Sequence, residues 1–226
     1  PVILAGHGIK LSKSVELFKS RMKSLNIPTL LTWSAIDIID HNNPLFFGSP
    51  GVYGQRSANF IFQKCDLLIT LGTRLTIPQT GYDMKEVARN ATIVMVDIDE
   101  SEFKEFVDFP IRADCGGFLE KMSGVKSSCD SWIRECQSIR EEFPIVDKNH
   151  RDDVFPNSYK MIQEISNYLK PNQIIVTDMG TALLSGHQSI HLGGDMTMFS
   201  SYGLGEMGYG LPAAFGAAIG GKGREV

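Results

Sequence analysis

Short apolar runs alternate with stretches of helical periodicity through the first half of the chain. Five runs are rich in Val, Ile and Leu and turn polar only at their ends, at 1–6, 27–33, 66–72, 91–99 and 109–114. Between them, apolar residues recur at helical spacing and predict helices at 15–25, 57–65, 83–90 and 115–122. This alternation predicts a doubly wound, mostly parallel α/β sheet with helices on both faces.

The pattern changes at residue 123 and restarts at residue 157. Residues 123–156 are polar apart from a charged helix predicted at 129–142, and we interpret them as a linker. Beyond it, with Asn157 or Ser158 as the first N-cap, helices and strands are predicted at 157–169, 173–178, 180–190, 196–200 and 208–220. We therefore predict a complete domain over 1–122, a linker with a helix over 123–156, and the first part of a second α/β domain over 157–226.

Composition narrows the classes of function. The chain has 226 residues and a net charge of −4, which gives no general attraction for nucleic acid or an anionic membrane. No apolar run approaches the roughly 18 residues of a membrane helix. The four cysteines fit no zinc spacing, so we expect reduced thiols and a cytoplasmic protein. The chain lacks an initiating Met and ends on what looks like a new strand, so we expect it to be part of a longer protein.

Glycine or small polar residues follow nearly every strand predicted for the first domain. In an open parallel sheet, ligands bind at this carboxyl edge. Backbone N–H groups there can hold a phosphate, and glycine lets a ligand approach closely. The alternative is that these glycines serve only tight turns and close packing. The segments are 5–8, 32–34, 72–74, 97–99 and 113–114.

Three charged side chains at this edge can have either a ligand-binding or a structural role. Arg74 can bind a phosphate or stack on a flat ring, or it can form a surface ion pair. Asp97 and Asp99 can accept ribose hydroxyls or cap the next helix.

A nicotinamide site is disfavoured, because Leu11 replaces the third glycine of the dinucleotide fingerprint and no acidic residue follows the strand at 27–33. We expect the five histidines to be structural or surface residues.

The second half repeats the arrangement of a strand end followed by a helix. Asp178 and Gly180 follow the strand at 173–178. A glycine loop then enters a helix of Ala and Gly at 208–220, which must pack closely on another subunit or under a cofactor. Methionine usually fills a core, but Met207 stands among glycines and has few side chains to pack against.

Four segments together resemble the thiamine-diphosphate-dependent 2-ketoacid enzymes, and among them the acetolactate synthase large subunits. They are 1–9, 49–75, 92–99 and 203–226. The resemblance implies that 1–122 is a central domain and 157–226 the start of the diphosphate-binding domain. It also implies the reaction, in which a 2-ketoacid such as pyruvate loses CO2 on the cofactor and the two-carbon unit passes to a second carbonyl.

The resemblance further implies cofactor contacts. Gly180 and Thr181 would contact the diphosphate, Met207 would hold the cofactor in its bent form, and Gly205 would offer a neighbouring backbone contact. The central domain of the synthases usually carries FAD without a redox role, although the sequence leaves FAD, ADP and no ligand open. The implied contacts are Gly6, His7, Gly8, Thr32, Trp33, Gly51, Val52, Tyr53, Gly72, Thr73, Arg74, Asp97, Ile98 and Asp114.

Some parts of the family's machinery lie outside these residues. The activating glutamate belongs to the family's N-terminal domain, and the segment that holds Mg2+ would follow the last residue. We therefore assign no catalytic residue and no metal ligand to this chain, and we expect it to be inactive alone. The family also implies a homodimer or homotetramer at full length, with a small-molecule substrate and neither nucleic acid nor membrane as a partner.

Two departures from the synthase pattern bear on the acceptor. Thr76, Ile77 and Pro78 stand where the synthases have two acidic residues and an arginine that binds a ketoacid carboxylate, and Ala182 replaces a histidine. Losing that arginine removes a contact of about 1.5–3 kcal/mol. The acceptor is then a second ketoacid or a different carbonyl such as a keto-sugar. Two further classes of function stay open on the sequence, a nucleotide-binding oxidoreductase and a non-catalytic nucleotide-binding module.

Overall fold

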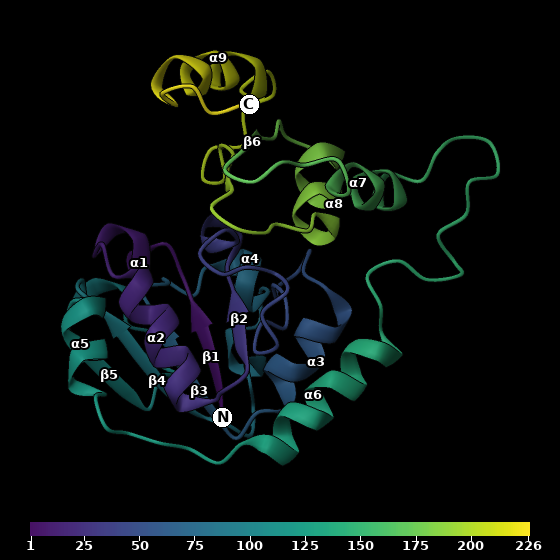
Figure 1. The fold of residues 1–226 in the computed structure, drawn as a ribbon. Helices are drawn as coiled ribbons and strands as arrows, with labels where there is room; N and C mark the ends of the chain where they lie inside the picture. The colour runs from purple at the N-terminus through teal and green to yellow at the C-terminus, as the bar shows by residue number, and fades with distance from the viewer. The chain divides into compact units, whose positions relative to one another are not determined.

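The computed structural model describes all residues, 1–226, which divide into two compact units (Figure 1). The first unit contains Pro1–Ile38 and Asn43–Pro144, and the second contains Ile39–Asn42 and Ile145–Val226. No helix in either unit is long and apolar enough to cross a membrane.

A five-stranded parallel sheet forms the centre of the first unit, with the strand order β2-β1-β3-β4-β5. Its strands are β1 (Val2–Ala5), β2 (Thr29–Leu31), β3 (Leu67–Leu71), β4 (Thr92–Asp97) and β5 (Phe109–Arg112). The chain starts in an interior strand, β1, and winds outwards in both directions, so the predicted doubly wound α/β fold is confirmed. All of β1 and β2 is buried, as expected for strands covered on both faces.

Helices cover both faces of this sheet (Figure 1). Helices α2 (Val15–Leu25) and α5 (Cys115–Lys121) pack together on one face, and α3 (Arg56–Lys64) and α6 (Asp130–Glu142) on the other. Trp132 of α6 donates its indole N–H to the carbonyl oxygen of Pro1 at 2.9 Å. Helix α6 thus belongs to the first compact unit. The shorter helical elements are α1 (Gly8–Leu11), η1 (Trp33–Ala35), α4 (Ile77–Thr80), η2 (Met84–Glu86) and η3 (Glu100–Glu102).

The helix predicted over 83–90 is wrong. Only the 3-10 turn η2 forms there, and the side chain of Asp83 caps it. Val87 then has an extended backbone, and Ala88 has a φ of 42°, in the left-handed region that ends a helix. Both residues are buried in the core around α3 and α6. Burial of Val87 and Ala88 therefore decides the backbone here, against the local helical spacing.

The second unit contains two parallel strands and three helices. They are α7 (Ser158–Ser166), β6 (Ile174–Val176), α8 (Thr181–Ser189), β7 (Thr197–Phe199) and α9 (Gly210–Gly220). Each element lies within the range predicted for it. Asn157 caps α7 by accepting from the amides of Tyr159 at 3.0 Å and Lys160 at 3.4 Å, which confirms the predicted N-cap.

Arg224 connects the beginnings of β6 and β7. Its guanidinium donates to the carbonyl oxygens of Asn172 at 2.7 Å and Gln173 at 3.3 Å, which precede β6. It also donates to the carbonyl oxygen of Asp195 at 3.1 Å and to the hydroxyl of Thr197 at 2.9 Å, at the start of β7. One side chain therefore bonds both strands at the same end.

All four cysteines are free and buried. Burial raises the pKa of the Cys65 thiol to about 11 and the pKa values of Cys115 and Cys136 to about 12. These thiols are protonated at neutral pH and serve as small apolar side chains.

Candidate functional site

The loops after β1 and β3 touch through their backbones. The amide of Gly6 donates to Leu71 at 2.9 Å, and the amide of Gly8 donates to Gly72 at 3.0 Å. A Cβ atom on Gly6 would lie 2.3 Å from the Gly72 carbonyl oxygen, and one on Gly8 would lie 2.5 Å from the Gly72 Cα. Close packing of two loops thus accounts for these three glycines, and their contact with a ligand remains a prediction. Thr73 follows and is buried.

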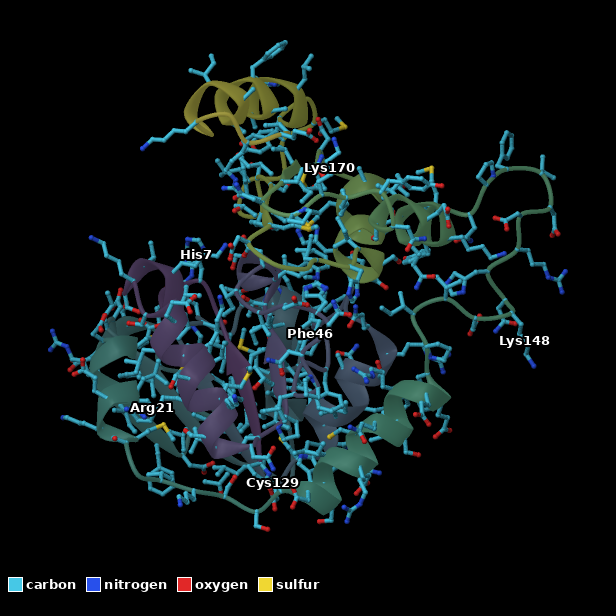
Figure 2. The ribbon with its side chains drawn as sticks, in the orientation of Figure 1. His7, Arg21, Phe46, Cys129, Lys148 and Lys170 are labelled. Carbon is cyan, nitrogen blue, oxygen red and sulfur yellow. The ribbon has the colours of Figure 1, made fainter.

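His7 and the segment after β2 lie together. Figure 2 shows His7 where α1 begins, and its Nδ1 lies 2.9 Å from the carbonyl oxygen of Ser34. Thr32 is buried, with its hydroxyl 3.3 Å from that of Ser34. The strand-end prediction thus places His7 and Thr32 at one edge of the sheet, as expected for parallel strands.

Trp33 and Tyr53 stack at this edge. Their ring centroids are 6.5 Å apart, with 26° between the ring planes, and 53% of Tyr53 is exposed. The two rings come from segments 20 positions apart in sequence, and we call the pair the aromatic platform. Trp33 is partly buried and Tyr53 is exposed, so the exposed ring of Tyr53 offers a flat ligand ring a partner of the same shape.

Asn59 of α3 holds the loop that carries Tyr53. Its side-chain oxygen accepts from the Gly51 amide at 2.7 Å, and its side-chain nitrogen donates to the Gly51 carbonyl at 2.9 Å. The amide of Val52 donates to the carbonyl of Pro78 at 2.9 Å, so the loop is also joined to α4. Gly51 has a φ of 135°, which only glycine adopts easily. Asn59 was not predicted as a site residue, because nothing in the local sequence pattern separates it from other polar helix residues.

Arg74 follows β3, and its side chain is 66% exposed. One guanidinium nitrogen lies 3.7 Å from a carboxylate oxygen of Glu102, and that carboxylate also accepts from Lys104 at 3.3 Å. Arg74 thus forms the surface ion pair that was one of its two predicted roles, but an ion pair this long and exposed contributes little to stability. The guanidinium stays accessible at the sheet edge, next in sequence to Thr73, and Ile98 after β4 is exposed as well.

The carboxylates at the strand ends shape their own loops. Asp99 accepts from the side chain of Ser101 at 2.7 Å and from its amide at 2.9 Å, and these bonds lower the pKa of Asp99. Asp99 therefore caps η3, in agreement with the capping interpretation. Asp97 is largely buried and accepts from the Asp99 amide at 3.1 Å. Asp114 caps α5, accepting from two first-turn amides at 2.9 and 3.3 Å.

Asp178 is the best-connected side chain at the end of β6. One carboxylate oxygen accepts from the amides of Met179 at 2.7 Å and Gly208 at 3.0 Å, and the other accepts from Gly210 at 2.9 Å. Hydrogen bonds from the amides of Met179, Gly210 and Gly208 lower the pKa of Asp178. The carboxylate of Asp178 thus connects the end of β6 to the start of α9.

The segment Ser200–Tyr209, named here the Met207 loop, is fixed at its other end too. The Ser200 hydroxyl donates to the carbonyl of Thr177 at 2.8 Å, and the Tyr202 hydroxyl lies 2.8 Å from Nε2 of His187. His187 is fully buried, which confirms the structural reading for this histidine. Met207 itself is 90% exposed, so it fills no core.

Gly180 and Thr181 lie at the beginning of α8, two and three positions after Asp178. Gly180 has a φ of 68°, and a Cβ atom there would find no atom within 4 Å. Thr181 is exposed and opens the helix. The first amides of an α-helix carry partial positive charge and bind anions, so a negative group fits the open space at this glycine.

Comparison with known proteins identifies the class. The family described as "Thiamine pyrophosphate enzyme, central domain" matches residues 1–122, and "Thiamine pyrophosphate enzyme, C-terminal TPP binding domain" matches residues 178–226. The chain belongs to the thiamine pyrophosphate enzyme family. Thiamine pyrophosphate is thiamine diphosphate, so the family expected from the four segments is confirmed.

Two relatives of this thiamine pyrophosphate enzyme chain are acetolactate synthase subunits. The acetolactate synthase large subunit of Lactococcus lactis subsp. lactis (strain IL1403) is 30% identical over 97% of this chain and 38% of its own length. The acetolactate synthase isozyme 1 large subunit of Escherichia coli (strain K12) is 30% identical over 100% of this chain and 40% of its own length. The chain thus spans about two fifths of the length of these curated relatives.

Proposed function

We propose that the protein is a thiamine-diphosphate-dependent carboligase, which decarboxylates a 2-ketoacid such as pyruvate and transfers the two-carbon unit to a second carbonyl. One observation carries this proposal: the Met207 loop is bonded through Asp178 to the strand end that leads into Gly180 and α8. An exposed methionine and an anion-binding helix start thereby share one strand end, within the residues that match the TPP-binding domain.

The residues present fit the cofactor. The open space at Gly180 and the first amides of α8 suit the diphosphate, with Thr181 beside it. Gly205, with a φ of 73°, shapes the loop that offers Met207 to the ring system. When bound, thiamine diphosphate supplies the carbanion chemistry, and these residues bind it, orient it and exclude water. We propose that Mg2+ accompanies the diphosphate through ligands outside these residues, and that no catalytic residue lies among them.

We propose that residues 1–122 form the central domain, 123–156 a linker with a helix, and 157–226 the first part of the diphosphate-binding domain. We further propose a cytoplasmic homodimer or homotetramer at full length, with no nucleic acid or membrane as a partner. Light scattering on the purified full-length protein measures the oligomeric state. A monomer at micromolar concentration would contradict that part of the proposal.

We propose a nucleotide cofactor, FAD or a smaller adenine nucleotide, at the edge of the five-stranded sheet. The aromatic platform and the accessible guanidinium of Arg74 support it, since they suit a flat ring and a phosphate. The proposed set contains the strand-end residues of the sheet: Gly6, His7, Gly8, Thr32, Trp33, Gly51, Val52, Tyr53, Gly72, Thr73, Arg74, Asp97, Ile98 and Asp114. The absorption spectrum of the full-length protein separates FAD, with visible flavin bands, from a colourless nucleotide.

The acceptor has a second candidate, a carbonyl compound without a carboxylate, such as a keto-sugar. Residues 76–80 carry no charged side chain, and Thr76 and Pro78 form the beginning of the short helix α4. No cation is thus available in this segment for a ketoacid carboxylate. Product analysis with pyruvate as sole substrate decides between the two. Acetolactate formation at normal turnover supports the synthase reaction, whereas CO2 release that requires a neutral carbonyl supports the second candidate.

Calorimetry on the full-length protein with Mg2+ tests the proposed function as a whole. We expect thiamine diphosphate to bind and CO2 to be released from pyruvate. Tight cofactor binding with no release from any 2-ketoacid would instead support a non-catalytic module. NADH-dependent turnover would support an oxidoreductase.

A further inference from the structure

We propose that Asp178 is a positioning residue, which holds the Met207 loop and the start of α9 against the carboxyl end of β6 and so determines where Met207 stands. The inference rests on the proposed function only in taking thiamine diphosphate as the group that Met207 meets. The holding itself is a property of the chain and is testable without any ligand.

Asp178 reaches two parts of the chain that are far apart in sequence. The amide of Met179 is its neighbour, whereas the amides of Gly208 and Gly210 lie 30 and 32 positions away. Both carboxylate oxygens are engaged by backbone N–H groups. Hydrogen bonds to an ionised acceptor are roughly twice as strong as neutral ones, so this single side chain is a strong connection between strand and loop.

The backbone opposite Asp178 is shaped to receive it. A Cβ atom on Gly210 would lie 3.2 Å from the backbone nitrogen, the Cβ and the Oδ2 of Asp178, a tight contact that a larger residue could make only if Asp178 shifts. Gly208 has a φ of 86°, a conformation that other residues rarely adopt. Two glycines thus let the carboxylate lie against bare amides at the N-terminal end of α9, where the helix dipole also favours a negative charge.

Met207 depends on this connection because little else fixes it. Its side chain is 90% exposed, so packing does not determine its place. The residue that follows it, Gly208, is bonded directly to Asp178. On the other side, Glu206 is paired with the Ser201 hydroxyl inside the same loop. Ser200 and Tyr202 fix the other end of the loop, five or more positions from Met207, so the Gly208 amide is the attachment to the rest of the unit that lies next to Met207 in sequence.

The chemistry requires a carboxylate and not an amide. All three partners of Asp178 are N–H donors, and an ionised carboxylate offers only acceptors. In Asp178→Asn, the side-chain NH2 group would face at least one backbone N–H. The variant keeps the size of the side chain and removes the connection on one side.

The test uses the full-length protein and two variants, Asp178→Asn and the control Asp153→Asn, which changes an exposed carboxylate before α7. Hydrogen exchange of the Gly208 and Gly210 amides is measured without cofactor, and the Kd of thiamine diphosphate with Mg2+ is measured by calorimetry. We expect Asp178→Asn to raise both the exchange rates and the Kd by about tenfold or more, from the loss of charge-assisted hydrogen bonds. Asp153→Asn should change neither.

A purely structural role is separated from positioning by the melting temperature. A fall in the melting temperature of Asp178→Asn with unchanged Kd would overturn the proposal, and so would native exchange rates at Gly208 and Gly210. If Asp178→Asn does not fold, Gly210→Ala tests the same contact from the other side and should raise the Kd similarly. If the native protein binds no thiamine diphosphate, the proposed function fails, while the exchange rates still decide whether Asp178 holds the loop.

Discussion

The amide of Gly8 donates to the carbonyl oxygen of Gly72 at 3.0 Å, so the loops after β1 and β3 meet backbone to backbone. There is no room for a side chain on either residue. A Cβ atom on Gly72 would lie 2.6 Å from the Cα of Gly8 and 2.9 Å from the sulfur of Cys115. The two neighbouring strands at the centre of the sheet are therefore joined at the edge where we propose a nucleotide.

Gly72→Ala should destabilise the first unit by about 2–4 kcal/mol. Overpacking contributes about 1–3 kcal/mol, and the φ of 59° at this residue adds about 1 kcal/mol for any L side chain. Denaturant unfolding followed by tryptophan fluorescence measures it, since both tryptophans, Trp33 and Trp132, lie in this unit. The control is Gly117→Ala in α5, where a Cβ meets nothing within 4 Å. Equal stabilities for the two variants would show that the contact is unimportant.

Tyr53→Ala should weaken nucleotide binding without unfolding the protein. Tyr53 is 53% exposed and stacks on Trp33, so its removal takes away half of the aromatic platform at little cost to the core. We expect the Kd of the nucleotide to rise about three- to tenfold, as for the loss of one aromatic pair. Tyr82→Ala, at an 89% exposed tyrosine in the same unit, is the matched control. A similar loss of affinity in both variants would argue against the platform.

Met207→Ala should lower the rate of CO2 release from pyruvate and raise the Kd of thiamine diphosphate, by about tenfold each, on the order of one lost large apolar contact. Leu204→Ala is the control from the same loop, because Leu204 is 84% exposed against 90% for Met207. Melting temperatures of both variants should stay native, since neither side chain is packed. Steady-state kinetics and calorimetry give the comparison. Equal changes in the rate of CO2 release and in the Kd for the two variants would show that Met207 does not contact the cofactor in the proposed way.

The hold of Asp178 on the Met207 loop should depend on pH in one direction. Backbone hydrogen bonds lower the pKa of Asp178 from its ordinary value of 3.8, so the closed loop favours the ionised carboxylate. The stabilisation is complete above pH 3.8 and is lost as the pH falls through the lowered pKa. No charged side chain contributes to this shift, and Glu206 in the loop is paired with Ser201.

Protection factors of the Gly208 and Gly210 amides, measured against pH, check this prediction. In the native protein they should be constant from neutral pH down to about pH 4 and then fall. In Asp178→Asn they should be low and independent of pH over the same range. A native profile that rises on acidification would contradict the assignment.

The sequence predicted β1, β3 and β4 well because most of their residues are buried, whereas β5 at the edge of the sheet is largely exposed. Buried strands read as continuous apolar runs, and these runs locate β1, β3 and β4. The same topology put the strand-end residues at one edge. The helix predicted over 83–90 failed because burial of Val87 and Ala88 outweighed the local spacing.

The roles of individual site residues were harder to predict, since they depend on contacts distant in sequence. The sequence marks Asp178 only as the end of a strand, and its partners Gly208 and Gly210 lie beyond a whole helix and strand. Asn59 bonds a loop that lies outside its own helix. Asp99 and Asp114 carry the right charge at the right edge, yet local capping engages them. Composition and periodicity contain no information about such pairings.

Arg224 has a consequence for how the small sheet of the second unit finds its alignment. Strands β6 and β7 pair over only three residues each, which leaves few backbone bonds to specify their register. A shift by one residue would turn the buried Met198 to the opposite face and expose it. Since Arg224 bonds fixed positions before both strands, any such slip also breaks part of its four hydrogen bonds. Arg224 therefore helps to specify the register in which β6 and β7 pair.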